Sequence, residues 1–153
     1  MTAKTEAVII TTRPGPRLDS LLARRERDVL VLTAEERRWG RRRVMTRGGR
    51  ELVLALPTGS VLGTGDVLHI DEAWYVEVAA ADEALLAVAP RTHEEALRVA
   101  FEVGNRHFTL AVDGARLLVP DDPAMEQLLR RLGVIFVRTR APFMPLGRGH
   151  RHD

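Results

Sequence analysis

Residues 108–119 read FTLAVDGARLLV, and this stretch decides the fold of the second half of the chain. Two apolar runs, FTLAV and ARLLV, flank the dipeptide Asp113-Gly114. An Asp-Gly pair between short runs of β-prone residues is typical of the two-residue turn that joins antiparallel strands. The stretch therefore predicts a β-hairpin.

A helix is predicted on the N-terminal side of this hairpin. Thr92 and Glu95 have the spacing of a capping box, in which each side chain satisfies backbone donors at the start of a helix. The pattern predicts a helix over 93–103 that ends at Gly104, because glycine readily adopts the left-handed conformation that closes many helices. Its expected core-facing residues are Leu97, Ala100 and Phe101.

A second helix is predicted on the C-terminal side. Asp122 is the expected N-cap, Pro123 the first helical residue and Gly133 the residue that ends the helix. Apolar residues recur at helical spacing between them, at Met125, Leu128, Leu129 and Leu132.

Outer strands complete the pattern of the second half. An apolar run at 85–89 precedes the first helix, and VIFVRTR at 134–140 follows the second. The order from residue 85 is therefore β-α-β-β-α-β. This order predicts an α+β ferredoxin-like domain with both helices on one face of a four-stranded sheet.

The first half of the chain reads as all-β. Leu52, Leu54 and Leu56 alternate after the turn at 47–50, and a second turn at 71–73 leads into the apolar run WYVEV. We therefore expect two small domains, an N-terminal β domain over 1–75 that binds a peptide or partner and a ferredoxin-like domain over 76–140. Residues 141–153 are rich in proline and glycine and are expected to form a short flexible tail that contains histidines.

Composition excludes several kinds of chemistry. The 153 residues contain no cysteine, which excludes disulfides, thiolate metal sites and a cysteine nucleophile. Any transition-metal site must therefore use histidine and oxygen ligands. No apolar run approaches the ~20 residues of a membrane span, so we expect a cytoplasmic protein with no membrane partner. No spacing motif predicts catalytic or cofactor-binding residues, and we expect no enzyme activity.

An arginine cluster, RRWGRRR, occupies residues 37–43. It has three interpretations: phosphate contacts of a nucleic-acid-binding module, a solvated strand edge that discourages aggregation, or a docking face for an acidic partner. The aromatic content of 5% and the net charge of only +2 disfavour the nucleic-acid alternative, which normally needs stacking aromatics. That alternative would use Arg37, Arg38, Arg41, Arg42 and Arg43.

Five histidines are the candidate ligands. His69 lies in a predicted strand and His93 at a helix start, where histidines are usually packed or solvated. His107 lies between the end of a helix and the start of a strand, so its position is fixed by folded elements on both sides. His150 and His152 flank Arg151 near the end of the chain, and short histidine tracts can bind metal. These residues alone leave open whether the three are ligands or surface histidines.

Four segments in order resemble one known family. LPTGSVLGTGDVL at 56–68, GNRHFTL at 104–110, DPAMEQLLRRLG at 122–133 and APFMP at 141–145 are similar to the UreE urease accessory proteins, which are nickel metallochaperones. The resemblance implies a polypeptide-binding N-terminal domain and a C-terminal domain that dimerises and binds metal.

The resemblance also implies the metal ligands. His107 would be the central ligand, and His150 and His152 would add imidazoles from the tail. Ni(II) would be the cargo, with Zn(II) or Cu(II) also binding in vitro, in a homodimer that acts with urease and other urease accessory proteins and not with nucleic acid. Because a two-fold axis doubles every residue near it, two copies of His107 could face one ion.

The chain departs from the family pattern in two places. Some relatives carry further histidines where this sequence has LLVPDDP, and some have polyhistidine tails where this one has HRH. Asp121 and Asp122 could offer oxygen ligands, but Asp122 is better explained as a helix cap, so both are left out of the predicted site.

Overall fold

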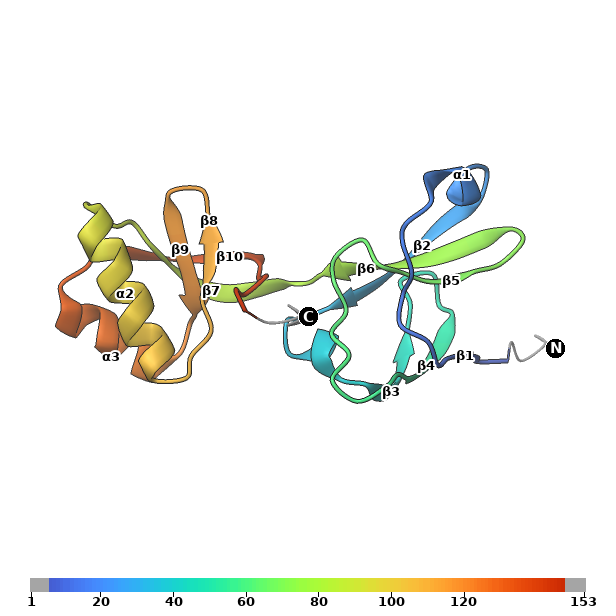
Figure 1. Cartoon of the computed structure of the whole chain (residues 1–153), viewed down its shortest axis with the longest axis horizontal. Helices are drawn as coiled ribbons and strands as arrows, with labels where there is room; N and C mark the ends of the chain where they lie inside the picture. The colour runs from blue at the N-terminus through green and yellow to red at the C-terminus, as the bar shows by residue number, and fades with distance from the viewer. Residues whose placement is uncertain (1–5, 148–153) are drawn as a thin grey trace. The chain divides into compact units, whose positions relative to one another are not determined.

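A computed structural model describes residues 6–147 of the chain. They form two compact units that divide between Ala80 and Ala81 (Figure 1). The division comes later than the predicted limit at residue 75, which falls inside strand β6 (Trp74–Ala80). All of β6 stays in the first unit because it pairs along its whole length with β2 (Glu26–Leu32).

The first unit contains two three-stranded sheets. One has the order β1-β4-β3, and the other has the order β2-β6-β5. Each of the two turns predicted in this half joins antiparallel strands, since β3 pairs antiparallel with β4 and β5 with β6. The remaining elements of this unit are β1 (Val8–Ile10), α1 (Asp19–Leu22), the 3-10 helix η1 (Glu36–Arg38), β3 (Arg41–Met45), β4 (Glu51–Ala55) and β5 (Val67–Ile70).

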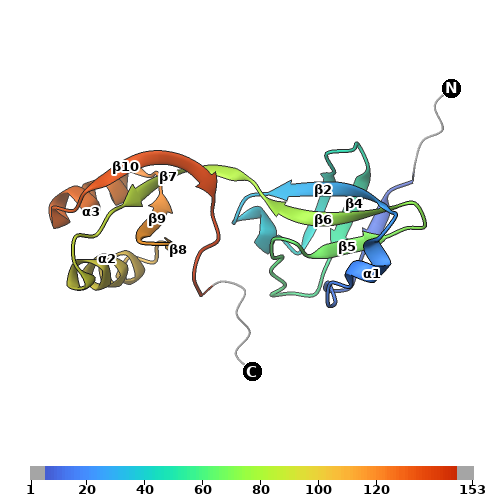
Figure 2. The same ribbon diagram turned by 90° about the horizontal axis from the view of Figure 1, so that it is seen from above.

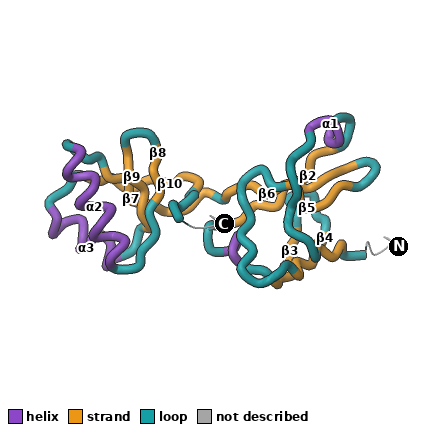
Figure 3. Tube along the Cα trace, viewed as in Figure 1, coloured by secondary structure: helices purple, strands orange, loops and turns teal. Residues whose placement is uncertain are grey.

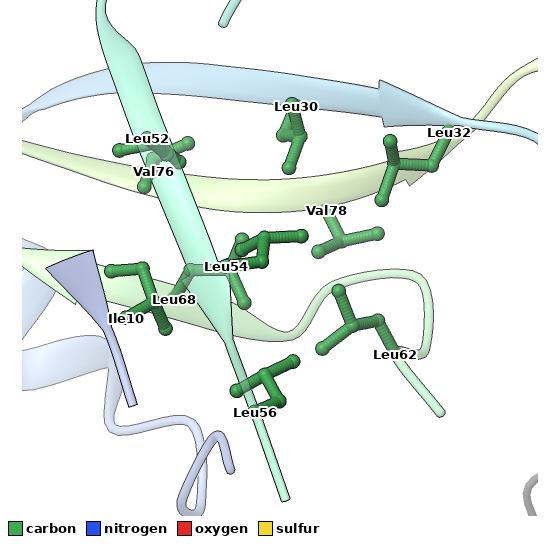
Figure 4. Close-up of a cluster of buried hydrophobic side chains, with 10 residues drawn as sticks. All are labelled: Ile10, Leu30, Leu32, Leu52, Leu54, Leu56, Leu62, Leu68, Val76 and Val78. Atoms are coloured by element: carbon green, nitrogen blue, oxygen red, sulfur yellow. The ribbon is translucent and has the colours of Figure 1, made fainter. Parts of the chain in front are cut away.

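The two sheets enclose one apolar core (Figure 4). The alternating Leu52 and Leu54 of β4 point toward Val76 and Val78 of β6, and all four side chains are almost completely buried. This alternation is the period-two pattern that the sequence shows, because one face of each strand lies against the core. Figure 3 shows that strands and loops make up most of this unit.

A buried carboxylate joins the two sheets of the first unit. Asp28 of β2 accepts hydrogen bonds from the backbone N–H of Gly48 (2.9 Å), the hydroxyl of Thr46 (2.5 Å) and the guanidinium of Arg50 (2.9 Å). Burial raises the pKa of Asp28, but these hydrogen bonds outweigh it and hold the pKa below its ordinary value. A Cβ on Gly48 would lie 2.9 Å from the carboxylate, so glycine is needed for this close approach.

Removing this carboxylate is expected to destabilise the first unit. Asp28→Asn should lower the free energy of unfolding by about 2–4 kcal/mol at neutral pH, because buried donors lose their charged acceptor. The lowered pKa means that the stabilisation is present above about pH 4 and is lost as pH falls through the folded-state pKa. Denaturant unfolding of both proteins from pH 7 to pH 2 measures this, and the difference between them should shrink with acid.

The matched control is Asp19→Asn, because the Asp19 side chain is 87% exposed and its ion pair with Arg17 is expected to contribute less than about 1 kcal/mol. An equal effect of the two substitutions would contradict the role assigned to Asp28.

The second unit has the predicted element order, β-α-β-β-α-β. Its sheet has the order β10-β7-β9-β8, and every neighbouring pair is antiparallel. The two longer helices lie on the same side of this sheet (Figures 1 and 2). The elements are β7 (Asp82–Val88), α2 (His93–Asn105), β8 (Ala111–Asp113), β9 (Arg116–Pro120), α3 (Pro123–Leu132) and β10 (Phe136–Pro142).

The start and end of α3 agree with the prediction. The Asp122 carboxylate accepts from the backbone N–H of Ala124 and of Met125, and Gly133 adopts a φ of +71°. In the hairpin between β8 and β9, the loop residues are Gly114 and Ala115 and not Asp113-Gly114, because Asp113 pairs with Arg116. Gly114 supplies the positive φ of +58° that the tight turn requires.

The buried face of α2 differs from the prediction. Val99 and Val103 are fully buried in the core, whereas Leu97 and Phe101 are 59% and 68% exposed. The helix carries two apolar stripes, and the stripe with the smaller side chains is the one that packs against the sheet and α3. The larger stripe remains on the surface.

The segment after residue 140 is more ordered than predicted. Strand β10 continues to Pro142, Phe143 is 3% exposed, and the backbone N–H of Leu146 donates to the carbonyl of Leu110 at 2.7 Å. Proline at the end of β10 is tolerated because β10 is an edge strand. Of the predicted tail, residues 148–153 lie outside the described part of the chain. Between residues 6 and 147, no helix is both long and apolar enough to cross a membrane.

Candidate metal-binding site

His107 lies two residues after the end of α2, in an unusual backbone conformation. The helix continues through Gly104 to Asn105, so the predicted end at Gly104 is wrong. The left-handed residue is instead His107, with a φ of +61°. Its N–H donates to the carbonyl of Gly104 (3.0 Å), and the N–H of Phe108 donates to the carbonyl of Val103 (3.2 Å). These two bonds are those of a Schellman motif, in which glycine usually holds the left-handed position.

The conformation of His107 has an energetic cost. In the left-handed region, a residue with a side chain has a conformational free energy about 1–2 kcal/mol higher than glycine. Histidine is nevertheless found there more often than most residues. Strained residues are concentrated at functional sites, where the side chain matters more than local stability. His107 is also exposed, so its imidazole is available to a ligand.

The other two histidines of the described chain are explained by their surroundings. The ring of His69 lies 5.3 Å from the ring of Trp74, and its Nε2 is 3.9 Å from a carboxylate oxygen of Asp71. His93 is the exposed first residue of α2. Within residues 6–147, neither belongs to a group of three possible metal ligands.

A complete metal site needs more ligands than the described residues supply. Between residues 6 and 147, no three histidine, aspartate or glutamate side chains are grouped in a way that could hold an ion. His150 and His152, the other two predicted ligands, lie outside the described residues. The structure therefore places one predicted ligand and leaves the other two as predictions.

The last described residues bring the chain back toward the segment that contains His107. Leu146 is hydrogen-bonded to Leu110, three positions after His107. Met144 and Pro142 line one pocket together with Ala111 and Leu118, on the side of the sheet opposite the helices. The chain therefore continues beyond Gly147 from a point near the loop of His107.

The exposed apolar stripe of α2, formed by Leu97 and Phe101, lies on the helix that precedes His107. Leu97 and Phe101 are one helical turn apart, and the same spacing continues to Asn105, two residues before His107. Sequence reasoning assigned both side chains to the core. The signal that could have separated them is the second apolar stripe, formed by Ala96, Val99 and Val103 at helical spacing.

The arginine cluster is only partly available as a charged surface. Arg37 is 5% exposed and donates to the carbonyl of Leu32 at 3.0 Å, so it cannot serve as the phosphate contact that the nucleic-acid alternative requires. The guanidinium of Arg42 lies over the ring of Trp39, 3.6 Å from its centroid. Arg43 is paired with Glu51.

An exposed imidazole in a left-handed backbone position is a feature of a ligand-binding site. Comparison with known families agrees. The model of the UreE urease accessory protein N-terminal domain matches residues 12–81, and that of the C-terminal domain matches residues 83–153. The chain belongs to the UreE family of urease accessory proteins, whose members are accessory proteins and not enzymes.

Relatives support the assignment over most of the chain. A urease accessory protein UreE of Ralstonia nicotianae is 39% identical over 144 residues, which are 91% of this chain and 68% of that protein. The UreE of a Synechococcus species is 41% identical over 80% of this chain and 83% of its own length. The UreE of Deinococcus radiodurans is 46% identical over 73% of this chain and 72% of its own length.

The strain at His107 leads to a test by stability. His107→Gly is expected to raise the free energy of unfolding by up to about 1 kcal/mol, because relief of the left-handed conformation outweighs the extra backbone entropy of glycine. The control His93→Gly should be neutral or destabilising, because glycine is a poor helix former. Denaturant unfolding measures both, and a His107→Gly protein less stable than the wild type would show that the backbone of His107 is not strained.

Proposed function

We propose that this chain is a metallochaperone that carries Ni(II) for the assembly of urease, with His107, His150 and His152 as ligands in a homodimer. The observation that carries the proposal is the exposed imidazole of His107 in a left-handed backbone position where glycine would be more stable. The relatives are urease accessory proteins, and this supports the role in urease assembly. The β-α-β-β-α-β order of the second unit fits the ferredoxin-like, metal-binding domain expected from the sequence.

The position of Leu146 supports tail ligands. Leu110, its hydrogen-bond partner, is three residues from His107, a separation of about 10 Å at most along an extended chain. His150 follows Leu146 by four residues, which span at most about 14 Å. Chain length therefore permits the imidazoles of His150 and His152 to reach the His107 of their own chain.

The exposed stripe of α2 supports dimer formation. Two large apolar side chains, Leu97 and Phe101, lie on the surface of the helix that ends beside His107. A two-fold interface over this stripe would bury both side chains and place two copies of His107 near the axis. Two folded imidazoles, one from each chain, would then be available to a single ion. The tail histidines would add further ligands.

The chemistry of the ligands suits a carrier. Imidazole is a borderline ligand that binds Ni(II), Cu(II) and Zn(II), and without thiolates the site holds the ion reversibly enough for transfer. Ligand type does not select nickel over copper or zinc, so we expect Zn(II) and Cu(II) to bind in vitro as well. Nickel as the natural cargo rests on the family.

The decisive experiment is calorimetric titration of Ni(II) into the wild type, His107→Gly and a chain truncated after Gly149. We expect tight binding near one ion per dimer that His107→Gly abolishes and truncation weakens. His107→Gly is preferred to alanine because it relieves the backbone, so lost binding cannot be attributed to unfolding. His93→Ala is the matched control and should bind as the wild type does.

The same titration at lower pH tests the ligand type. Because imidazole binds metal in its neutral form, nickel affinity should fall as the pH drops through about 6.5. Undiminished binding to His107→Gly, or affinity that is constant between neutral and mildly acidic pH, would contradict the proposed site.

The interface is tested separately by mass. Phe101→Glu should convert a dimer into a monomer in sedimentation or light scattering, because a charge at the centre of an apolar interface is desolvated without a partner. Val112→Glu changes a 55% exposed apolar residue of β8 in the same way and should leave the dimer intact. If Val112→Glu dissociates the dimer and Phe101→Glu does not, the interface lies on the sheet edge and not on α2.

A further inference from the structure

Among residues 6–147, strand β3 has one hydrogen-bonding edge that no other strand covers. It is the edge strand of the sheet β1-β4-β3, and β4 occupies its other side. The carbonyl of Gly40 accepts from the N–H of Leu56, and the N–H of Thr46 donates to the carbonyl of Arg50. Since hydrogen-bonded pairs alternate along an antiparallel ladder, residues 40, 42, 44 and 46 direct their backbone groups toward β4. The N–H and C=O groups of Arg41, Arg43 and Met45 therefore point outward.

Within the described part of the chain, no backbone hydrogen bond reaches these three outward residues. The other sheet edges of the first unit differ from β3. The edge of β2 receives a hydrogen bond from the N–H of Arg47 to the carbonyl of Val29, and β1 has only three residues. The edge strand β5 lies beside the segment 12–16, with which it lines a pocket.

The outward backbone groups and the arginine side chains occur at the same residues. Arg41 and Arg43 alternate with Arg42 and Val44, so both lie on the face of the sheet turned away from the core. Both are exposed, and among the described residues Arg41 has no ion-pair partner, while Arg43 has Glu51. Met45 continues the same face and is 61% exposed. A strand added here would meet arginine at two alternate positions, Arg41 and Arg43, and then Met45.

We propose that the outer edge of β3 binds an extended acidic segment of a partner protein by strand addition. The segment's backbone pairs with Arg41, Arg43 and Met45, and its glutamate or aspartate side chains, spaced two residues apart, lie opposite Arg41 and Arg43. Main-chain hydrogen bonds supply affinity and the cross-strand charge pairs supply the preference for acidic sequences. This docking surface is independent of the metal site proposed for the second unit.

A protein segment fits this surface better than nucleic acid does. The aromatic ring nearest the arginines, that of Trp39, is already covered on one face by Arg42 at 3.6 Å, which removes a platform for base stacking. Arg37 is buried and cannot contact phosphate. An incoming polypeptide strand pairs with the alternating outward N–H and C=O groups of β3, whereas a phosphate backbone does not.

The test is fluorescence anisotropy with a labelled peptide of about eight residues that alternates glutamate with threonine. Binding to the full chain should weaken on the order of tenfold when both Arg41→Gln and Arg43→Gln are present, from the loss of two cross-strand charge pairs. The pair Arg24→Gln and Arg47→Gln removes the same charge from exposed positions of the same unit and should leave binding unchanged. A peptide with glutamine in place of glutamate should also bind more weakly.

Strand addition is separated from simple charge attraction by the peptide backbone. Methylating the backbone nitrogens of one alternate set of peptide residues should abolish binding, and methylating the other set should not, because only one set faces β3. The proposal would be overturned if methylation of either set left peptide binding equally intact. It would also be overturned if the two double variants weakened peptide binding equally. Single-stranded DNA that binds more tightly than the peptide, and whose binding is lost when Arg41→Gln and Arg43→Gln are present, would also overturn the proposal.

Discussion

Two backbone hydrogen bonds at the end of α2 determine where the candidate site lies. The bonds from His107 and Phe108 to Gly104 and Val103 close the helix and reverse the chain toward β8. They can form only if the residue between helix and strand adopts a left-handed conformation, and this chain places histidine there. The backbone of His107 is thus held by the same geometry that terminates the helix.

Most elements of the fold follow from local patterns. The hairpin of β8 and β9, the turns at 47–50 and 71–73, the cap of α3 and the end of α3 at Gly133 were predicted because each depends on a few neighbouring residues with restricted backbone or hydrogen-bonding behaviour. Two local predictions for α2 were wrong. Gly104 was expected to end the helix and Leu97, Ala100 and Phe101 to face the core, whereas the helix continues to Asn105 and buries Val99 and Val103.

The candidate site was less accessible to such reasoning. His107 was singled out as a junction residue, but its role as a ligand came from the resemblance to a family and not from spacing. Arg37 shows the opposite difficulty, because a charged residue in an arginine run is expected on the surface. Its burial depends on the carbonyl of Leu32, a partner that is defined only once β2 and η1 have folded.

The link between Asp28 and the turn of residues 46–50 has a consequence for molecular recognition. This turn joins β3 to β4, so the carboxylate of Asp28 ties the hairpin of one sheet to the edge strand β2 of the other. A hairpin fixed at its turn loses little freedom when another chain pairs with its edge, and less of the binding energy is spent on ordering the receptor. The first unit thus offers a rigid template on which only the incoming segment has to become ordered.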